Sequence, residues 1–306
     1  MSKFGIDISV WQKGFDFDKA KAEGVQFAIL RGAYHMSKDK CFEDFYAACK
    51  ARKIPVGVYL YSMAKTVAEA KEEAENLIAN VLKGKQFEYP IYMDIEDKVQ
   101  RALGKDLLTK IVIEFCETLE AAGYYVGIYS TAAFLSSYTH ESKLSAYDKW
   151  IAQWAKKCSY KGDYGMWQYG GETNLLRSNK VAGVVCDQDY AIKDYPAIIK
   201  ALGLNGYDST EKVEDKVESS DTATETETKA EGYTMKMRNL KRGCRGEDVR
   251  ALQILLAGRG YKGKMGKPDG IFGPNTEGAV ELCQKDNGLT VDRIAGPDTM
   301  GVLMGV

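Results

Sequence analysis

The chain has 306 residues, of which 45% are hydrophobic and 28% charged, and its formal net charge at pH 7 is -1. This composition is that of an ordinary globular protein long enough for about two domains, and its balanced charge argues against a nucleic-acid partner. No apolar run approaches the roughly 20 residues of a membrane span, and Asp7 comes too early to leave room for a signal peptide. We therefore expect synthesis in the cytoplasm without an export signal.

Cysteine and histidine usage limits the chemistry further. The seven cysteines are odd in number and scattered, without a CxxC pair, which favours free thiols over a disulfide framework or a zinc knuckle. His35 and His140 are the only histidines and stand far apart, which argues against a zinc hydrolase and against a histidine-based triad. We expect neither a bound metal nor another cofactor.

Eight short apolar runs with strand character alternate with helical patterns in the first part of the chain. The runs lie at residues 4–8, 27–31, 56–62, 91–95, 125–130, 150–153, 166–169 and 184–186. The clearest helical patterns lie at residues 42–52, 67–82 and 106–122. Repeated strand–helix units predict an α/β fold with a parallel sheet, and eight strands suffice to close it into a barrel. Because the later connections are short and weakly helical, we expect an irregular, TIM-like β/α barrel over residues 1–204.

The segment EYPIYMDIED at residues 88–97 combines a buried strand with two carboxylates. The apolar side chains at positions 91, 93 and 95 would face one side of a strand, and those of Tyr92, Asp94 and Glu96 the other. Two carboxylates on one buried face have different pKa values and can form the acid–base pair of glycosidic bond cleavage. Alternatively, the strand ends near Ile95 and Glu96 belongs to its solvated exit. This segment alone does not decide between the two.

Catalytic groups of a β/α barrel stand at the carboxyl ends of its strands. Four acids lie at or near such ends: Asp7, Asp94, Glu96 and Asp187. Closure of the barrel places the eighth strand beside the first, so Asp7 and Asp187 become neighbours. Their convergence favours a catalytic role over that of carboxylates that cap turns.

Aromatic residues accumulate near the same strand ends: Tyr34, Tyr59, Tyr61, Tyr129, Trp154, Trp167 and Tyr169. Sugar rings stack on aromatic side chains, so a glycan-binding site would use several of them, although an aromatic residue in a strand more often belongs to the core. Tyr61, Tyr129 and Trp154 are the best placed to contact a ligand. Arg31, at the end of the second run, either contacts substrate or forms a structural ion pair with one of the four acids.

Eight motifs carry a resemblance to a known family. They are GIDISVWQ, LRGAY, VGVYLYS, YPIYMDIED, GIYS, WIAQW, MWQY and VVCDQDY. Their order, and their places near strand ends, resemble those of family 25 glycoside hydrolases, the N-acetylmuramidases (lysozymes) of phage endolysins and bacterial autolysins. The resemblance covers residues 1–200. It implies an irregular β/α barrel that cleaves the β-1,4 bond between N-acetylmuramic acid and N-acetylglucosamine.

The same resemblance implies roles for the singled-out residues. Glu96 would be the general acid and Asp94 its partner, with Asp7 and Asp187 as supporting acids; the three aromatic residues would line sugar subsites. Asp94 would be a nucleophile if its carboxyl group lies about 5 Å from that of Glu96, and a wider gap would suit an inverting reaction. In a third route Asp94 orients the substrate's own N-acetyl group as that group attacks the anomeric carbon. We favour this route because N-acetylmuramic acid carries the group.

The remainder of the chain changes character twice. Residues 205–235 include an acidic stretch with almost no large apolar side chain, which predicts a flexible linker. Residues 236–306 contain two helical stripes. The first consists of Leu240, Val249, Leu252, Leu255 and Leu256, and the second contains Ala279, Val280 and Leu282. The segments DGIFGPNT and RIAGPDT each end in a residue that can cap a helix. This region resembles a small all-α, three-helix peptidoglycan-binding domain. We expect it to concentrate the enzyme at the bacterial cell wall.

Glu231-Gly232 must be encoded by a purine-rich sequence a few bases before Met235, with Met237 as a second candidate start. This arrangement resembles a ribosome-binding site before an internal start codon, which would produce a free copy of the C-terminal domain. The leading hypothesis is a phage endolysin released to the wall at lysis. A bacterial autolysin, and a wall-binding protein built on an inactive barrel, are the alternatives.

Overall fold

The computed structural model describes residues 2–145, 147–207, 239–261, 265 and 268–304. The candidate internal starts Met235 and Met237 and most of the predicted linker lie outside these residues. The chain divides into two compact units, Met1–Ser209 and Thr210–Val306. Within the described residues, no helix has the length and apolar character needed to cross a membrane.

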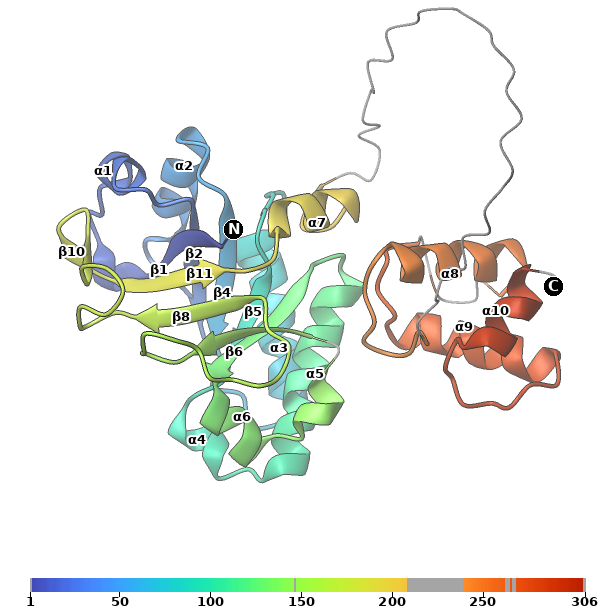
Figure 1. The fold of residues 1–306 in the computed structure, drawn as a ribbon. Helices are drawn as coiled ribbons and strands as arrows, with labels where there is room; N and C mark the ends of the chain where they lie inside the picture. Colours follow the sequence, from blue (N-terminus) through green and yellow to red (C-terminus); the bar gives the residue numbers. More distant parts are fainter. Residues whose placement is uncertain (1, 146, 208–238, 262–264, 266–267, 305–306) are drawn as a thin grey trace, which may run out of the picture. The chain divides into compact units, whose positions relative to one another are not determined.

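The first unit is built on a closed barrel of eight strands (Figure 1). In order around the barrel these are β1 (Lys3–Ile8), β2 (Phe27–Tyr34), β4 (Val56–Tyr61), β5 (Ile91–Asp94), β6 (Val126–Thr131), β7 (Asp148–Ala152), β8 (Met166–Gly170) and β11 (Asp187–Ala191). The first seven are parallel to one another, whereas β11 is antiparallel to both β8 and β1. The predicted irregular β/α barrel is confirmed.

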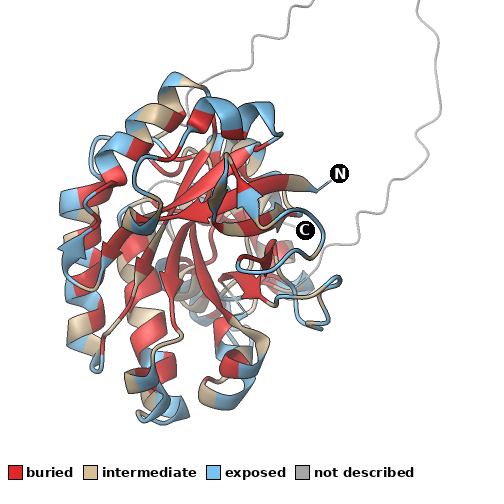
Figure 2. Ribbon diagram, turned by 90° about the vertical axis from the view of Figure 1, so that its left-hand side faces the viewer, coloured by how far each residue is buried: buried red, intermediate tan, exposed pale blue. Residues whose placement is uncertain are grey.

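Amphipathic helices cover much of the outer face of this barrel. The longer ones are α2 (Phe42–Ala51), α3 (Val67–Leu77) and α5 (Lys105–Ala121), and α3 continues into a π-helical turn, Ile78–Leu82. The shorter ones are α1 (Phe17–Ala22), α4 (Lys98–Arg101), α6 (Ala132–Tyr138) and α7 (Tyr195–Ala201). Figure 2 shows strands that are buried almost throughout and helices with one buried and one exposed face. The apolar stripe of α5 packs in the same core cluster as Ile91, Met93 and Ile95, the predicted apolar face of β5.

The eighth barrel strand is not the one that the sequence predicts. The predicted strand at residues 184–186 is instead β10 (Val184–Val185), which pairs with β9 (Lys180–Val181) in a small separate hairpin. The barrel strand follows it, as β11. Its sequence DQDYA looks like a turn because it carries two acids, and those acids are tolerated because they enter a polar part of the barrel interior. Since β11 is antiparallel, its first residue lies at the rim where the parallel strands end.

The first unit continues past the predicted boundary at residue 204. Asn205 is fully buried; its side-chain amide donates to the carbonyls of Phe87 and Tyr89 and accepts from the Tyr125 backbone N–H. The Tyr207 hydroxyl donates to Glu88. These bonds attach the end of the unit to the amino-terminal side of β5.

The second unit contains α8 (Glu247–Gly258), α9 (Pro274–Asp286) and α10 (Pro297–Met304) around one apolar core. Two details of the predicted stripes are wrong. Leu240 precedes the first helix and forms a β-bridge with Ala295, although it is buried as predicted. Leu282 is 49% exposed, and the neighbouring Cys283 takes the buried position instead.

Two buried glutamines give this unit an internal repeat. Gln253 on α8 and Gln284 on α9 each place Nε2 within 2.6 to 3.1 Å of an Asp side chain, an Ile carbonyl and a Thr hydroxyl, and these three acceptors share its two hydrogens. The partners are Asp269, Ile271 and Thr276 for the first, and Asp292, Ile294 and Thr299 for the second. Each glutamine therefore holds the loop that begins the next helix.

Candidate active site

The four predicted acids come together at one rim of the barrel. Asp7 on β1 and Asp187 on β11 are directly paired across the two strands, as barrel closure predicts. Asp94 ends β5, level with Tyr61 on β4 and Tyr129 on β6. The backbone N–H of Ile95 donates to the Tyr129 carbonyl at 3.1 Å, so the extended chain continues beyond Asp94 and carries Glu96 to the same rim.

Asp94 is the most enclosed acid of the predicted pair. It is 3% exposed, and its Oδ1 has no hydrogen-bond partner among the described residues. Burial, and then repulsion from Glu96, raises the pKa of Asp94 well above its ordinary value, while the positive charge of Arg31 partly opposes this. Asp94 thus offers an unsatisfied oxygen that a ligand could use.

Glu96 and Asp187 are half-buried, and the charge of Glu96 acts on Asp187. Burial and the neighbouring Asp97 raise the pKa of Glu96, which Arg101 on α4 partly offsets. Burial, followed by repulsion from Glu96 and Glu172, raises the pKa of Asp187 from 3.8 to about 6. This end of the barrel can therefore hold both protonated and ionised carboxyl groups near neutral pH, which is what acid–base chemistry requires.

Two polar residues that the sequence analysis did not single out complete this group. Asp189 is fully buried and accepts a 2.8 Å hydrogen bond from Trp150 Nε1. Gln168 donates to Asp7 at 2.9 Å. Burial and repulsion from Asp189 and Asp187 raise the pKa of Asp7 well above its ordinary value, and the Gln168 hydrogen bond opposes them. The alternation in DQDY, which puts both acids on one face, was the available signal for Asp189.

The predicted aromatic residues differ in how far a ligand could reach them. Trp154 is 45% exposed. Tyr61 is half-buried, stacks on Tyr34 with ring centroids 5.0 Å apart, and donates from its hydroxyl to Asp97 at 3.0 Å. Tyr129 is 9% exposed and packs edge-on against Trp150 inside the barrel. Trp154 and the stacked pair present the larger surfaces to solvent.

One prediction for Arg31, an ion pair with one of the four acids, is wrong. The Arg31 Nε donates at 2.8 Å to Asp39, a buried carboxylate that also accepts from the backbone N–H groups of Val10 and Cys41. Asp39 lies just beyond the short strand β3 (Ser37–Lys38), which pairs with the end of β2, and this is why no strand-end pattern revealed it. The charge of Arg31 still lowers the pKa of Asp94.

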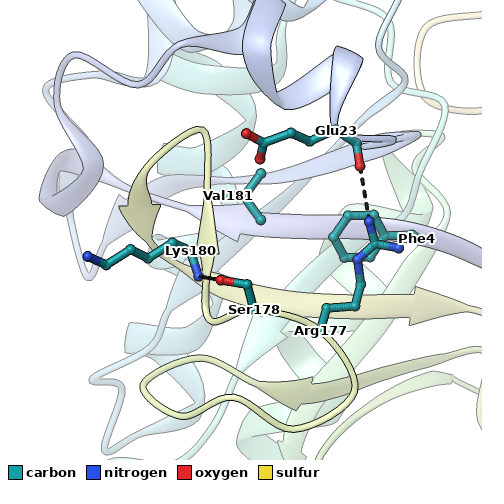
Figure 3. Close-up of a pocket in the computed structure, with 6 residues that line it drawn as sticks. All are labelled: Phe4, Glu23, Arg177, Ser178, Lys180 and Val181. Carbon is teal, nitrogen blue, oxygen red and sulfur yellow. Dashed lines mark hydrogen bonds between the residues drawn. The ribbon is translucent and has the colours of Figure 1, made fainter.

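A pocket of about 540 Å³ lies elsewhere, beside the first residues of β1 (Figure 3). The Arg177 guanidinium stands 3.9 Å from the ring centroid of Phe4 and donates to the carbonyl of Glu23. Trp167 and Tyr169, which the sequence suggested for the rim, belong to the core cluster that contains Phe4. None of the four acids lines this pocket.

The cysteines and histidines take no visible part in the acid group. All seven cysteines are free thiols, and five of them are buried. His35 contacts Glu73 of α3 at 2.7 Å, and His140 contacts Asp106 of α5 at 3.0 Å.

Several carboxyl groups with raised pKa values at the carboxyl-end rim of a β/α barrel, bordered by aromatic rings, define a glycoside hydrolase. Comparison with known families agrees. The chain belongs to the glycosyl hydrolases family 25, whose profile matches residues 6–176. A second profile, that of a putative peptidoglycan binding domain, matches residues 245–303.

Individual relatives cover the chain to different extents. The autolytic lysozyme of Clostridium acetobutylicum is 25% identical over 299 residues, which is 97% of this chain and 77% of that protein. The zinc D-Ala-D-Ala carboxypeptidase of Streptomyces albus G is 48% identical over 60 residues, 20% of this chain and 24% of that protein. Among solved structures, the CTP1L endolysin aligns with a TM-score of 0.56 at 21% identity, over 65% of this chain and 70% of that one.

Proposed function

We propose that the protein is a peptidoglycan hydrolase, an N-acetylmuramidase (lysozyme) that cleaves the β-1,4 bond between N-acetylmuramic acid and N-acetylglucosamine. The observation that carries the proposal is the convergence of Asp7, Asp94, Glu96 and Asp187 at one rim of a family 25 barrel. The lysozyme relative, which aligns along 97% of the chain, supports peptidoglycan as the substrate. The second unit would hold the enzyme at the wall through its peptidoglycan-binding fold.

In this proposal Glu96 is the general acid. It is half-buried, so a glycosidic oxygen can reach it, and burial raises its pKa, which favours the protonated form that a general acid needs. Asp187, whose pKa is raised to about 6 in part by repulsion from Glu96, can exchange its own proton near neutral pH. Asp7 and Asp187 would support the charge that develops on the sugar.

We assign Asp94 to orienting the N-acetyl group of the substrate as it attacks the anomeric carbon. Its depth and its unpartnered Oδ1 support this, because the acetamido N–H is a donor that such an oxygen can accept. Arg31, held by Asp39, would act through its charge on Asp94. Tyr61, Trp154 and the deeper Tyr129 would contact the sugar rings.

The test is mass spectrometry of the products released from purified peptidoglycan after borohydride reduction. Wild type should give reduced muramic acid ends. Glu96→Gln should give none, a loss on the order of 10²–10⁴ in rate. Glu114→Gln makes the same change on α5 and should leave the products unaltered. Reduced glucosamine ends or free stem peptides would show that another bond is cleaved.

The role of Asp94 is tested by NMR of the first anomer formed. Retention of configuration fits both a nucleophile and the assisted route, whereas inversion contradicts both. Glycan from which the N-acetyl groups have been removed separates the two retaining routes. The assisted route predicts that this glycan is not cleaved, and cleavage at an undiminished rate would assign Asp94 as the nucleophile.

We also propose that the enzyme reaches the wall at phage lysis and that translation from Met235 or Met237 yields a free second unit. An endolysin regulated by a secondary translation product, CTP1L, supports the second idea. Intact mass spectrometry of freshly expressed protein, compared with a Met235→Leu, Met237→Leu double variant, tests it. Absence of a fragment beginning at either methionine in wild type contradicts the internal start.

A further inference from the structure

Gln168 occupies a central place among the groups just described. It lies in β8, is 3% exposed, and its side chain is bonded at both ends. Nε2 donates to Asp7 Oδ2 at 2.9 Å, and Oε1 accepts from the Tyr129 hydroxyl at 3.0 Å and from Trp154 Nε1 at 3.1 Å. One amide therefore touches an acid of β1 and two aromatic residues assigned to the sugar.

The chemistry of these partners fixes the direction of the amide. An indole N–H can only donate, so the Gln168 atom beside Trp154 must be the oxygen. The nitrogen then faces Asp7, where a carboxylate oxygen accepts from it. The reverse orientation would set N–H against N–H at Trp154 and oxygen against oxygen at Asp7.

Asp7 has reason to need this donor. Asp189 and Asp187 crowd it from β11, and together with burial they raise the pKa of Asp7, which the Gln168 bond lowers. Asp189 accepts a hydrogen bond from Trp150, and because it is fully buried its charge is not screened by solvent. Gln168 thus supplies a neutral donor to Asp7 at a point where three carboxyl groups, those of Asp7, Asp187 and Asp189, crowd together.

The oxygen of the same amide holds the Trp154 ring in place. This ring is 45% exposed, and an exposed ring without an anchor samples several rotamers. The bond from Nε1 to Gln168 restricts the plane that a sugar would stack on.

We propose that Gln168 is a positioning residue that couples Asp7 to Tyr129 and Trp154, so that one amide plane sets both the orientation of the acid and the surface that receives the glycan. This inference rests on the proposed function, which assigns those three residues to the site. It predicts that the two ends of the amide can be disabled separately.

Gln168→Glu keeps the acceptor end and removes the donor toward Asp7. At about pH 7 kcat should fall by about 100-fold, and the deficit should shrink about tenfold or more near pH 5, where a protonated carboxyl donates again. KM should change little, because Tyr129 and Trp154 keep their acceptor. The charged and titratable groups around this point are Asp7, Tyr59, Asp94, Glu96, Cys186, Asp187, Asp189, Arg31 and Tyr129.

Gln168→Met has nearly the same volume and disables both ends. KM should rise about threefold or more together with the loss in kcat, and acid should not restore either. Gln188→Glu is the matched control, since Gln188 is a buried glutamine of β11 that accepts from Tyr169 and donates to the Ser178 carbonyl. It should show no recovery at acid pH relative to wild type.

The rates are measured with the full chain on purified peptidoglycan across pH. A Gln168→Glu enzyme equal to wild type, or equally impaired at both pH values, overturns the inference, as does the same acid recovery in Gln188→Glu. Should Gln168→Glu fail to fold, Tyr129→Phe decides: a loss of about threefold in kcat/KM is expected, and an unchanged value overturns the inference. Inactive wild type would refute the proposed function instead.

Discussion

Asp187→Asn should make the barrel more stable at neutral pH while lowering the rate of hydrolysis. The raised pKa of Asp187, about 6 against 3.8, spans about two pH units, which at about 1.4 kcal/mol each sets an upper limit of about 3 kcal/mol. Because Asp187 is half-buried and partly screened by water, we expect a gain of about 1–2 kcal/mol. Asparagine has nearly the same shape and no charge to desolvate.

The sign of the effect follows from proton linkage. Between about pH 4 and pH 6 the folded protein keeps a proton on Asp187 that the unfolded chain has released, so wild type loses stability as the pH rises through this window. Above it, the ionised carboxylate destabilises the fold by its full amount. The variant should therefore exceed wild type at pH 7 and match it near pH 3.5.

Urea denaturation followed by tryptophan fluorescence measures this directly. All four tryptophans, Trp11, Trp150, Trp154 and Trp167, belong to the first unit, so the signal reports only on the barrel. Asp163→Asn changes a carboxylate that is 90% exposed and should give no gain at either pH. A variant no more stable than wild type at pH 7, or equally stabilised at both pH values, would refute the reasoning. Its hydrolysis rate should fall about tenfold or more.

Two further substitutions test the surroundings of the site and the second unit. A Cβ on Gly171 would clash with Asp187 Oδ1 and approach Trp154 Cζ2 to 3.0 Å, so Gly171→Ala should lower the rate of peptidoglycan hydrolysis about tenfold. In the control Gly170→Ala the new Cβ has its closest contact with Leu175, at 3.3 Å, and the rate should fall far less. Equal rates in the two variants would contradict the geometry. Gln284→Leu should cost the second unit about 2–4 kcal/mol by leaving several buried polar groups unpaired, abolish sedimentation with cell walls and spare the cleavage of soluble glycan; retained wall binding would contradict it.

The parts of the fold that follow from local pattern were accessible from the sequence. The alternation around Met93 and Asp94 predicts which side chains lie on each face of β5. The apolar stripe of α5 predicts which face of that helix is buried. The rule that parallel strands end at one rim then brings Asp94 and Asp7 together without knowledge of any contact. Asp187 reaches this rim at the start of an antiparallel strand, although it was expected there at the end of a parallel one.

The polar contacts between strands were not accessible, for a physical reason. Gln168, Asp189 and Asp39 lie on or beside strands, where the period-two pattern registers only how apolar a position is. The hydrogen bond of Gln168 is made to Asp7, more than a hundred residues away in the chain, and the ion pair of Asp39 is made to Arg31 across the short strand β3. Pairing across a closed barrel, and the direction of β11, decide these contacts.

Each of the two buried glutamines of the second unit stabilises the helix that comes next in the chain. Corresponding residues of the two loops, such as Asp269 and Asp292 or Thr276 and Thr299, are 23 positions apart, and each loop is shaped by the helix that precedes it. Loss of Gln284 should therefore loosen the start of α10 first, and loss of Gln253 the start of α9, and either loss then weakens the one core that all three helices share. Local unfolding of the second unit should therefore begin at a different helix in each of the two variants.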